Sequence, residues 1–254
     1  MNKSIFRVGQ SCTISFAGLL LSISQTALAG PPLTIDDPGV LDPGQWEIIT
    51  AVTYADTTEG SATQLPILDV SYGVTENVQV SAAYPYVFVD PKDDSSDNDF
   101  GNLQVGAKWR FFNGENLQLA VAPLYAFGIS VNAAKRGVGD DEDALFVPLE
   151  IEYTLGNWRF NGEFGYASIK NEPDGWGYGA AVAHPLGTRT EIMFELYGGA
   201  DDDFDNDNLN YHVGFDFAWS EDLHILVSAG SGLTEPAREA ELDFDFFRGL
   251  QYFR

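Results

Sequence analysis

The chain has 254 residues, a net charge of −25 and a single cysteine, Cys12. Nucleic-acid binding is excluded, because phosphates would repel so acidic a chain. Beyond residues 1–29 no apolar stretch is long enough to cross a membrane as a helix, so a helical membrane protein is excluded as well.

Residues 1–29 have the features of a secretory signal peptide. Lys3 and Arg7 precede a mostly apolar run, and Ala27-Leu28-Ala29 forms an A-x-A cleavage site before Gly30. The run is too short and too rich in Ser and Thr for a membrane anchor. We therefore expect export through the Sec pathway and a mature chain without cysteine. Since no disulfide can stabilise that chain, another device must hold it together.

Residues 30–44 form a proline-rich segment, with Pro31, Pro32, Pro38 and Pro43. Prolines at this density prevent both a regular helix and a central strand. Two placements are open: a plug inside the structure that follows, or a tail in the periplasm.

From residue 45 onward, apolar and polar side chains alternate in runs that end at turn residues. Leu103, Val105, Ala107, Trp109 and Phe111, for example, are separated by Gln, Gly, Lys and Arg. Successive side chains of a strand point to opposite faces, so each run predicts a strand with one apolar and one polar face. We predict twelve strands, at residues 45–55, 64–74, 78–89, 101–112, 117–129, 144–155, 158–167, 176–184, 188–198, 208–218, 223–230 and 244–253.

The connections between these strands alternate in length. Short turns such as Gly156-Asn157 alternate with long, strongly polar connections near residues 56–63, 90–100, 130–143, 168–175, 199–207 and 231–243. A β-sandwich has no reason to sort its loops in this way, whereas transmembrane barrels have short periplasmic turns and longer extracellular loops. The sequence therefore predicts an all-β fold, a single antiparallel up-and-down transmembrane β-barrel over residues 45–254 in the bacterial outer membrane, with acidic extracellular loops.

Aromatic residues on the apolar face support this prediction. Trp46 and Trp109 lie near the short turns, and Tyr54 and Tyr84 lie near the long connections. Aromatic rings prefer the two membrane–water boundaries, so two girdles at opposite strand ends are expected of a barrel that spans a membrane.

Four short motifs lie along the mature chain: Pro32–Gly39, Pro43–Glu47, Tyr72–Val80 and Gly249–Tyr252. They resemble the outer-membrane proteins filed under the meta-pathway of phenol degradation. The resemblance implies a barrel of about twelve strands, proposed to pass small aromatic or apolar compounds, and supplies no catalytic residues. Members usually end on an aromatic residue that the barrel-insertion machinery reads, whereas here Arg254 is the last residue.

The polar face of the predicted strands carries opposed charges near the short turns. Charges crowded in a narrow tube are expected to pair, because an unpaired ion away from bulk water is costly. We therefore predict a salt-bridged layer at the periplasmic end, and individually hydrated charges in an open channel are the alternative. The layer consists of Glu47, Lys108, Arg110, Glu150, Glu152, Arg159, Arg189, Glu191 and Asp216.

Toward the long connections the inward positions become apolar. An apolar vestibule favours an apolar or aromatic solute, which gains roughly 25 cal/mol per Å² of apolar area removed from water. Prolines such as Pro66, Pro85, Pro123 and Pro148 are typical of bulges, and a bulge would reverse the facing of the residues beyond it. The predicted vestibule residues are Leu65, Ile67, Val87, Phe146, Met193 and Tyr197.

No catalytic, metal or cofactor site is predicted. A hydrolase needs a serine activated by histidine, but His184 would face lipid, His224 would lie more than roughly 13 Å from Ser228 along its strand, and His212 has no nearby serine. The acidic tract 201–207 alternates oxygen donors as calcium loops do, but it lacks their glycine and glutamate. A solvated loop is the favoured interpretation, and a weak divalent site that bridges lipopolysaccharide phosphates is the alternative.

The sequence thus predicts an outer-membrane channel for passive uptake of small, apolar or aromatic molecules, without a cofactor. Its expected partners are outer-membrane lipid, lipopolysaccharide, a small-molecule solute and the barrel-insertion machinery, and its oligomeric state is left open. Two other functions are considered. One is a structural or adhesive surface protein with a filled lumen, and the other is a lipid hydrolase that depends on His212.

Overall fold

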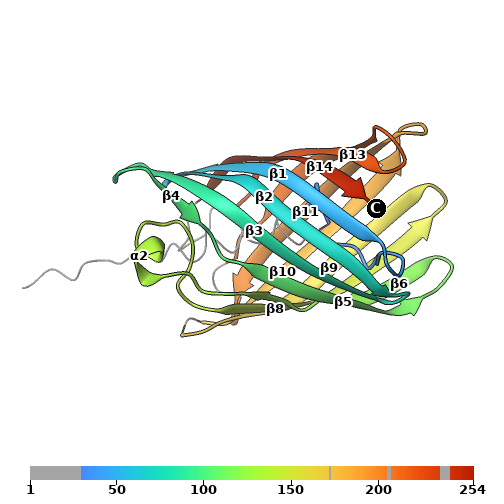
Figure 1. The fold of residues 1–254 in the computed structure, drawn as a ribbon, viewed down its shortest axis with the longest axis horizontal. Helices are drawn as coiled ribbons and strands as arrows, with labels where there is room; N and C mark the ends of the chain where they lie inside the picture. The colour runs from blue at the N-terminus through green and yellow to red at the C-terminus, as the bar shows by residue number, and fades with distance from the viewer. Residues whose placement is uncertain (1–29, 172, 205–206, 235–240) are drawn as a thin grey trace, which may run out of the picture.

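The computed structural model describes residues 30–171, 173–204, 207–234 and 241–254. The predicted signal peptide, residues 1–29, lies outside this part of the chain. The strands run obliquely to the long axis and wrap into one barrel (Figure 1). They are β1 (Trp46–Thr57), β2 (Gly60–Thr75), β3 (Val78–Pro91), β4 (Asp97–Phe100), β5 (Gln104–Asn113), β6 (Leu117–Val121), β7 (Leu124–Ala126), β8 (Ala144–Leu155), β9 (Trp158–Ile169), β10 (Gly175–Pro185), β11 (Thr190–Asp201), β12 (Asn210–Ala218), β13 (Leu223–Gly232) and β14 (Leu242–Phe253).

The barrel is closed by antiparallel pairing of its first and last strands. β1 pairs with β14 from Glu47 opposite Phe253 to Thr57 opposite Leu242. β4 and β5 both pair with β3, and β6 and β7 both pair with β8, so each couple fills one place in the wall. The prediction of a twelve-stranded antiparallel barrel is therefore confirmed. Pro123 separates β6 from β7, because proline has no N–H to donate to the sheet.

Two connections differ from the prediction. The connection expected at residues 56–63 is only Thr58-Glu59, because β1 and β2 continue as a polar hairpin with Asp56 opposite Ser61. Backbone pairing does not require apolar side chains where the strands project beyond the apolar zone. The helix α2 (Val131–Ala134), capped by Ser130, lies in the connection between β7 and β8 and was not predicted.

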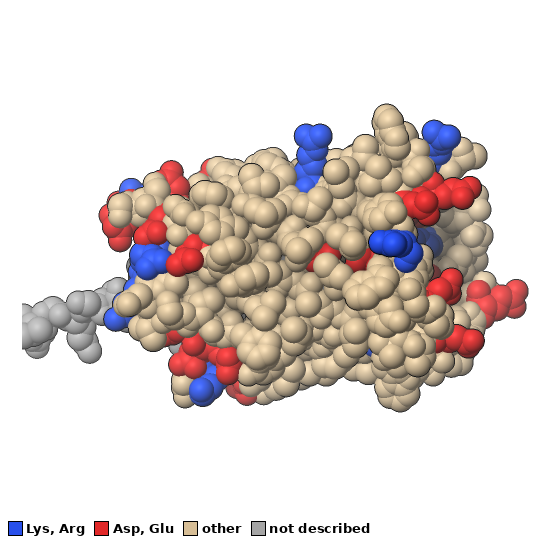
Figure 2. Space-filling model, viewed as in Figure 1, with Lys and Arg blue, Asp and Glu red and all other residues tan. Residues whose placement is uncertain are grey.

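The outer face of the wall is apolar. Trp109, Leu149, Phe164 and Leu250 are about half exposed, as outward side chains of a barrel are. Asp, Glu, Lys and Arg gather mainly at the two ends, and a largely uncharged zone lies between them (Figure 2). Arg248 is an exception, since it is exposed between Val52 and Val227. In the described residues no helix is long and apolar enough to cross a membrane.

Candidate functional site: the barrel lumen

The N-terminal segment, residues 30–44, crosses the interior of the barrel. The Pro32 carbonyl accepts a hydrogen bond from Ser228 on β13, at 2.5 Å. Farther along, the Leu41 N–H donates to Gln79 on β3, at 2.9 Å. The Gly44 N–H then donates to the Gly73 carbonyl of β2, at 2.8 Å. The segment therefore contacts the wall at β13, β3 and β2 before the chain enters β1.

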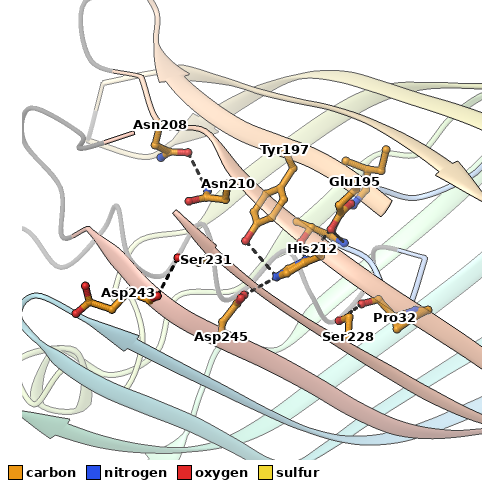
Figure 3. Close-up of polar contacts among 12 residues, drawn as sticks. Pro32, Glu195, Tyr197, Asn208, Asn210, His212, Ser228, Ser231, Asp243 and Asp245 are labelled. Carbon is orange, nitrogen blue, oxygen red and sulfur yellow. Dashed lines mark hydrogen bonds and ion pairs between the residues drawn. The ribbon is translucent and has the colours of Figure 1, made fainter. Parts of the chain in front are cut away.

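A buried carboxylate on β11 is the main polar anchor of this segment. Glu195, which has no exposed surface, accepts hydrogen bonds from the N–H groups of Thr34 and Ile35, at 2.7 and 3.1 Å. Its Oε1 is also 2.7 Å from Nδ1 of His212, whose Nε2 is 2.7 Å from Asp245. Figure 3 shows Glu195, His212 and Asp245 converging inside the wall. An imidazole between two carboxylates satisfies both only when each nitrogen carries a proton.

Apolar side chains complete this anchor. Leu33 and Ile35 of the segment are buried in one cluster with Ala181, Met193 and Tyr197 of the wall. Burying a side chain of this size contributes about 1.5–3 kcal/mol. The β10–β11 side of the lumen is therefore filled by the segment itself.

Lys108 on β5 holds the same segment from the other side. Its ammonium is 2.6 Å from Asp36, 3.5 Å from Glu150 and 2.5 Å from the Asp37 carbonyl oxygen, to which it donates. The Asp36 N–H in turn donates to Glu163 on β9, at 3.2 Å. The segment is thus fixed between β5, β9 and β11.

A cavity of about 370 Å³ remains in the lumen beside the N-terminal segment, and we call it the chamber. Its wall includes residues at the start of β1, the start of β13 and the end of β14, such as Glu47, His224 and Phe253. It also extends along the segment as far as Leu124 and Phe146. The segment therefore borders this volume without filling it.

The outer mouth, the barrel end that carries the long connections, is covered by the connection that contains α2. Val138 of this connection is fully buried against Ala55, Val87 and Val89 of the wall. The Asn102 amide donates to the carbonyls of Phe127 and Asp140, at 2.8 and 2.9 Å, and holds the connection in place.

The structure brings part of the predicted charged layer together. Lys108 pairs with Glu150, and Arg159 pairs with Glu152 and Glu191, at 3.5 and 2.5 Å. Asp216 lies 2.9 Å from His224, and Glu47 accepts a hydrogen bond from Gln251 at 2.6 Å.

Two arginines of the predicted layer lie elsewhere or have other partners. Arg110 donates to Gln118 and to the Glu76 carbonyl instead of to a carboxylate. Arg189 is exposed in the turn before β11, and this strand begins at Thr190, two residues later than predicted. Arg189 therefore lies outside the strand that was expected to carry it.

Most of the predicted vestibule residues are covered by other parts of the chain, and one lies on the outer face. Ile67 is buried against Leu226 and Phe247, Val87 against the outer-mouth connection, and Met193 and Tyr197 against the N-terminal segment. Phe146 borders the chamber. Leu65 was wrongly placed, because it is 49% exposed on the outer face. Two residues of β2, Leu65 and Pro66, oppose the single Val52 of β1, and this bulge reverses the side-chain order.

Three carboxylates that contact the N-terminal segment or His212 were not among the predicted site residues, namely Glu195, Glu163 and Asp245. Each has an inward position in the alternation of its strand, which is a signal that was available. Their partners could not be inferred from the sequence, because the contacts join distant positions: Thr34 and Glu195 are 161 positions apart. His212, considered for hydrolysis, has both ring nitrogens directed at carboxylates, and His184 packs against Trp158 at a centroid distance of 4.3 Å.

Metal binding is not suggested by the described residues, in which no three His, Cys, Asp or Glu side chains form a group suited to an ion. The predicted acidic tract 201–207 is described only in part, since residues 205 and 206 lie outside the structure.

The chain is similar to known outer-membrane porins and channels. A family model described as Gram-negative porin matches residues 49–209. An outer membrane channel from Pseudomonas putida F1 has a similar fold, with a TM-score of 0.69 at 10% identity over 86% of this chain and 98% of that one. The KdgM porin and the NanC porin are also similar, with TM-scores of 0.58 and 0.57 at 11% and 9% identity, over 81% of this chain and 98% of each of theirs. None of the curated proteins matches the sequence.

Proposed function

We propose that this chain, which belongs to the Gram-negative porin family, is an outer-membrane channel for the passive uptake of small, apolar or aromatic molecules. The observation that carries the proposal is the chamber of about 370 Å³ inside a closed barrel. A volume of this size is within the range of about 300–1,000 Å³ that small-molecule sites occupy. Ile49, Leu124 and Phe146 give the chamber apolar wall area for such a solute.

The proposal can be tested by swelling of liposomes that contain the mature protein. Nicotinamide and xylose are suitable probes, because they are both uncharged and similar in size, and one is aromatic. Faster entry of nicotinamide, corrected for protein-free liposomes, is the expected result. Equal rates of entry would refute the preference for aromatic solutes but would still support a channel. If neither solute enters liposomes that hold folded protein, the channel itself is contradicted.

A second function is favoured by a specific observation. The N-terminal segment and the outer-mouth connection both fill the lumen, as the structural or adhesive alternative expects. Removing residues 31–41 separates the two functions. The channel predicts conductance in planar bilayers that rises when residues 31–41 are removed, whereas the structural alternative predicts that the intact protein does not conduct ions.

Export through the Sec pathway belongs to the same proposal, although residues 1–29 lie outside the described structure. N-terminal sequencing of the protein from outer membranes should begin at Gly30. Protein that still carries residues 1–29 would contradict cleavage at Ala27-Leu28-Ala29.

A further inference from the structure

The charges that border the chamber are strongly unbalanced. Eight carboxyl side chains line it, against the basic groups of Lys108 and Arg159 and one histidine, His224. Both basic groups are already committed, Lys108 to Asp36 and Glu150, and Arg159 to Glu152 and Glu191. His224 is committed to Asp216. The chamber wall therefore holds a surplus of carboxyl groups over basic groups.

Asp69 on β2 contributes to this surplus in an unusual way. It is only 5% exposed and borders the chamber, yet its Oδ1 accepts no hydrogen bond from any residue that the structure describes. A buried acceptor without a donor is costly, so native proteins rarely keep one unless something else satisfies it. Asp69 thus combines an acceptor atom that no described residue satisfies with a place in the chamber wall.

Further oxygen acceptors lie beside Asp69 on the same inward face. Ser71 follows it by two residues on β2 and is directly opposite both Glu47 of β1 and Ser81 of β3. Directly opposite side chains have Cβ atoms about 4.5–5.5 Å apart. Ser81 also lines the chamber, and its other cross-strand neighbour, Gly106, has no side chain. Two carboxylates and two hydroxyl groups therefore share one small region of the chamber wall.

This arrangement matches the needs of an ammonium group. A primary ammonium has three N–H donors and no acceptor, and its hydrogen bonds to carboxylates are about twice as strong as those between neutral groups. A metal ion fits less well, since the described residues contain no cluster of three acidic or histidine ligands. The apolar side chains of Ile49 and Phe146, which also border the chamber, suit an apolar body attached to the ammonium.

We propose that the chamber binds small molecules that carry a primary ammonium group on an apolar or aromatic body, with Asp69 and Glu47 as the carboxylates that receive it. The inference rests on the proposed function for the route by which the ligand enters, and it names the substrate class of that site. Benzoate and other anions of the same size are repelled by the same carboxylates.

Calorimetric binding to the mature protein in detergent tests the proposal without requiring conduction. Benzylammonium, benzyl alcohol and benzoate share one ring and differ in charge. Benzylammonium should bind, and the other two should bind at least about tenfold more weakly. Equal affinity for benzoate and benzylammonium, or no affinity for benzylammonium, would overturn the proposal.

Variants locate the site. Asp69→Asn should weaken benzylammonium binding by at least about tenfold, and Glu47→Gln and Ser71→Ala should weaken it less. Asp222→Asn is the matched control, because it makes the same chemical change in an exposed turn. Far-UV circular dichroism verifies folding, and Glu47→Gln keeps the test decisive if Asp69→Asn does not fold. Unchanged affinity in both carboxylate variants would refute the assignment.

The two proposals can fail separately. Benzylammonium binding without ion conductance in planar bilayers would contradict the channel and support the ammonium site. Conductance without charge-dependent binding would support the channel and refute the ammonium site.

Discussion

On the β11–β13 side of the lumen, Glu195 accepts hydrogen bonds from two backbone N–H groups and contacts His212, whereas on the β1–β3 side the Oδ1 atom of Asp69 has no donor among the described residues. Both side chains are buried, with 0% and 5% of their surfaces exposed. Burial alone therefore does not distinguish their roles, but the supply of donors does. A carboxylate satisfied by its own chain fixes structure, and one left unsatisfied can receive a ligand.

Replacement of Glu195 by Ala should produce the largest change. The N–H groups of Thr34 and Ile35 would lose their acceptor and His212 would lose one of its two carboxylates, so the free energy of unfolding should fall by about 3–5 kcal/mol. Urea titration of the detergent-solubilised protein measures this change. Glu195→Gln, which keeps one acceptor oxygen, should lie between the variant and the wild type. A loss below about 1 kcal/mol would show that the segment is not anchored there.

Replacement of Leu33 by Ala tests the apolar part of the same anchor. Leu33 is 6% exposed and packs against Met193 and Tyr197, so the truncation should cost about 2–4 kcal/mol and leave a cavity. The measurement is again the urea midpoint with an unchanged slope. Leu41→Ala is the control within the same segment, because Leu41 is only partly buried, and its effect should be smaller. Equal effects of the two changes would contradict a localised anchor.

Replacement of Asp69 by Asn should have the smallest effect and the opposite sign. Without ligand, removing an unsatisfied buried carboxylate should raise the free energy of unfolding by about 1–2 kcal/mol. Adding benzylammonium should stabilise the wild type and not the variant, because only the wild type binds it. A destabilised ligand-free variant would mean that Asp69 already has a structural role, and the contrast with Glu195 would disappear.

The strands were predictable because alternation is a local property of the sequence. The alternating run at residues 45–55, for example, can be identified without knowledge of its neighbours, and it forms most of β1. Leu65 was not predictable in the same way, since the bulge that turns it outward depends on how β2 pairs with β1 and β3. The polar hairpin at Thr58-Glu59 was missed because strand pairing there continues without apolar side chains.

The interior was less predictable than the wall. The sequence left the N-terminal segment with two placements, and the choice depends on contacts with Glu195 and Lys108, far along the chain. Opposed charges in the lumen were foreseen, but Arg110 and Arg189 show that inward alternation alone does not assign ion pairs. Which carboxylate would lack a donor was visible only in three dimensions.

The seam between β1 and β14 has a consequence for biogenesis. Gln251 and Glu47, joined across this seam, are 204 positions apart, and both edges of the sheet stay open until the last strand is in place. Open strand edges in lipid leave backbone groups unsatisfied and invite aggregation in water. A nascent chain of this kind must reach its membrane unfolded and protected, and the ring can be sealed only after synthesis is complete.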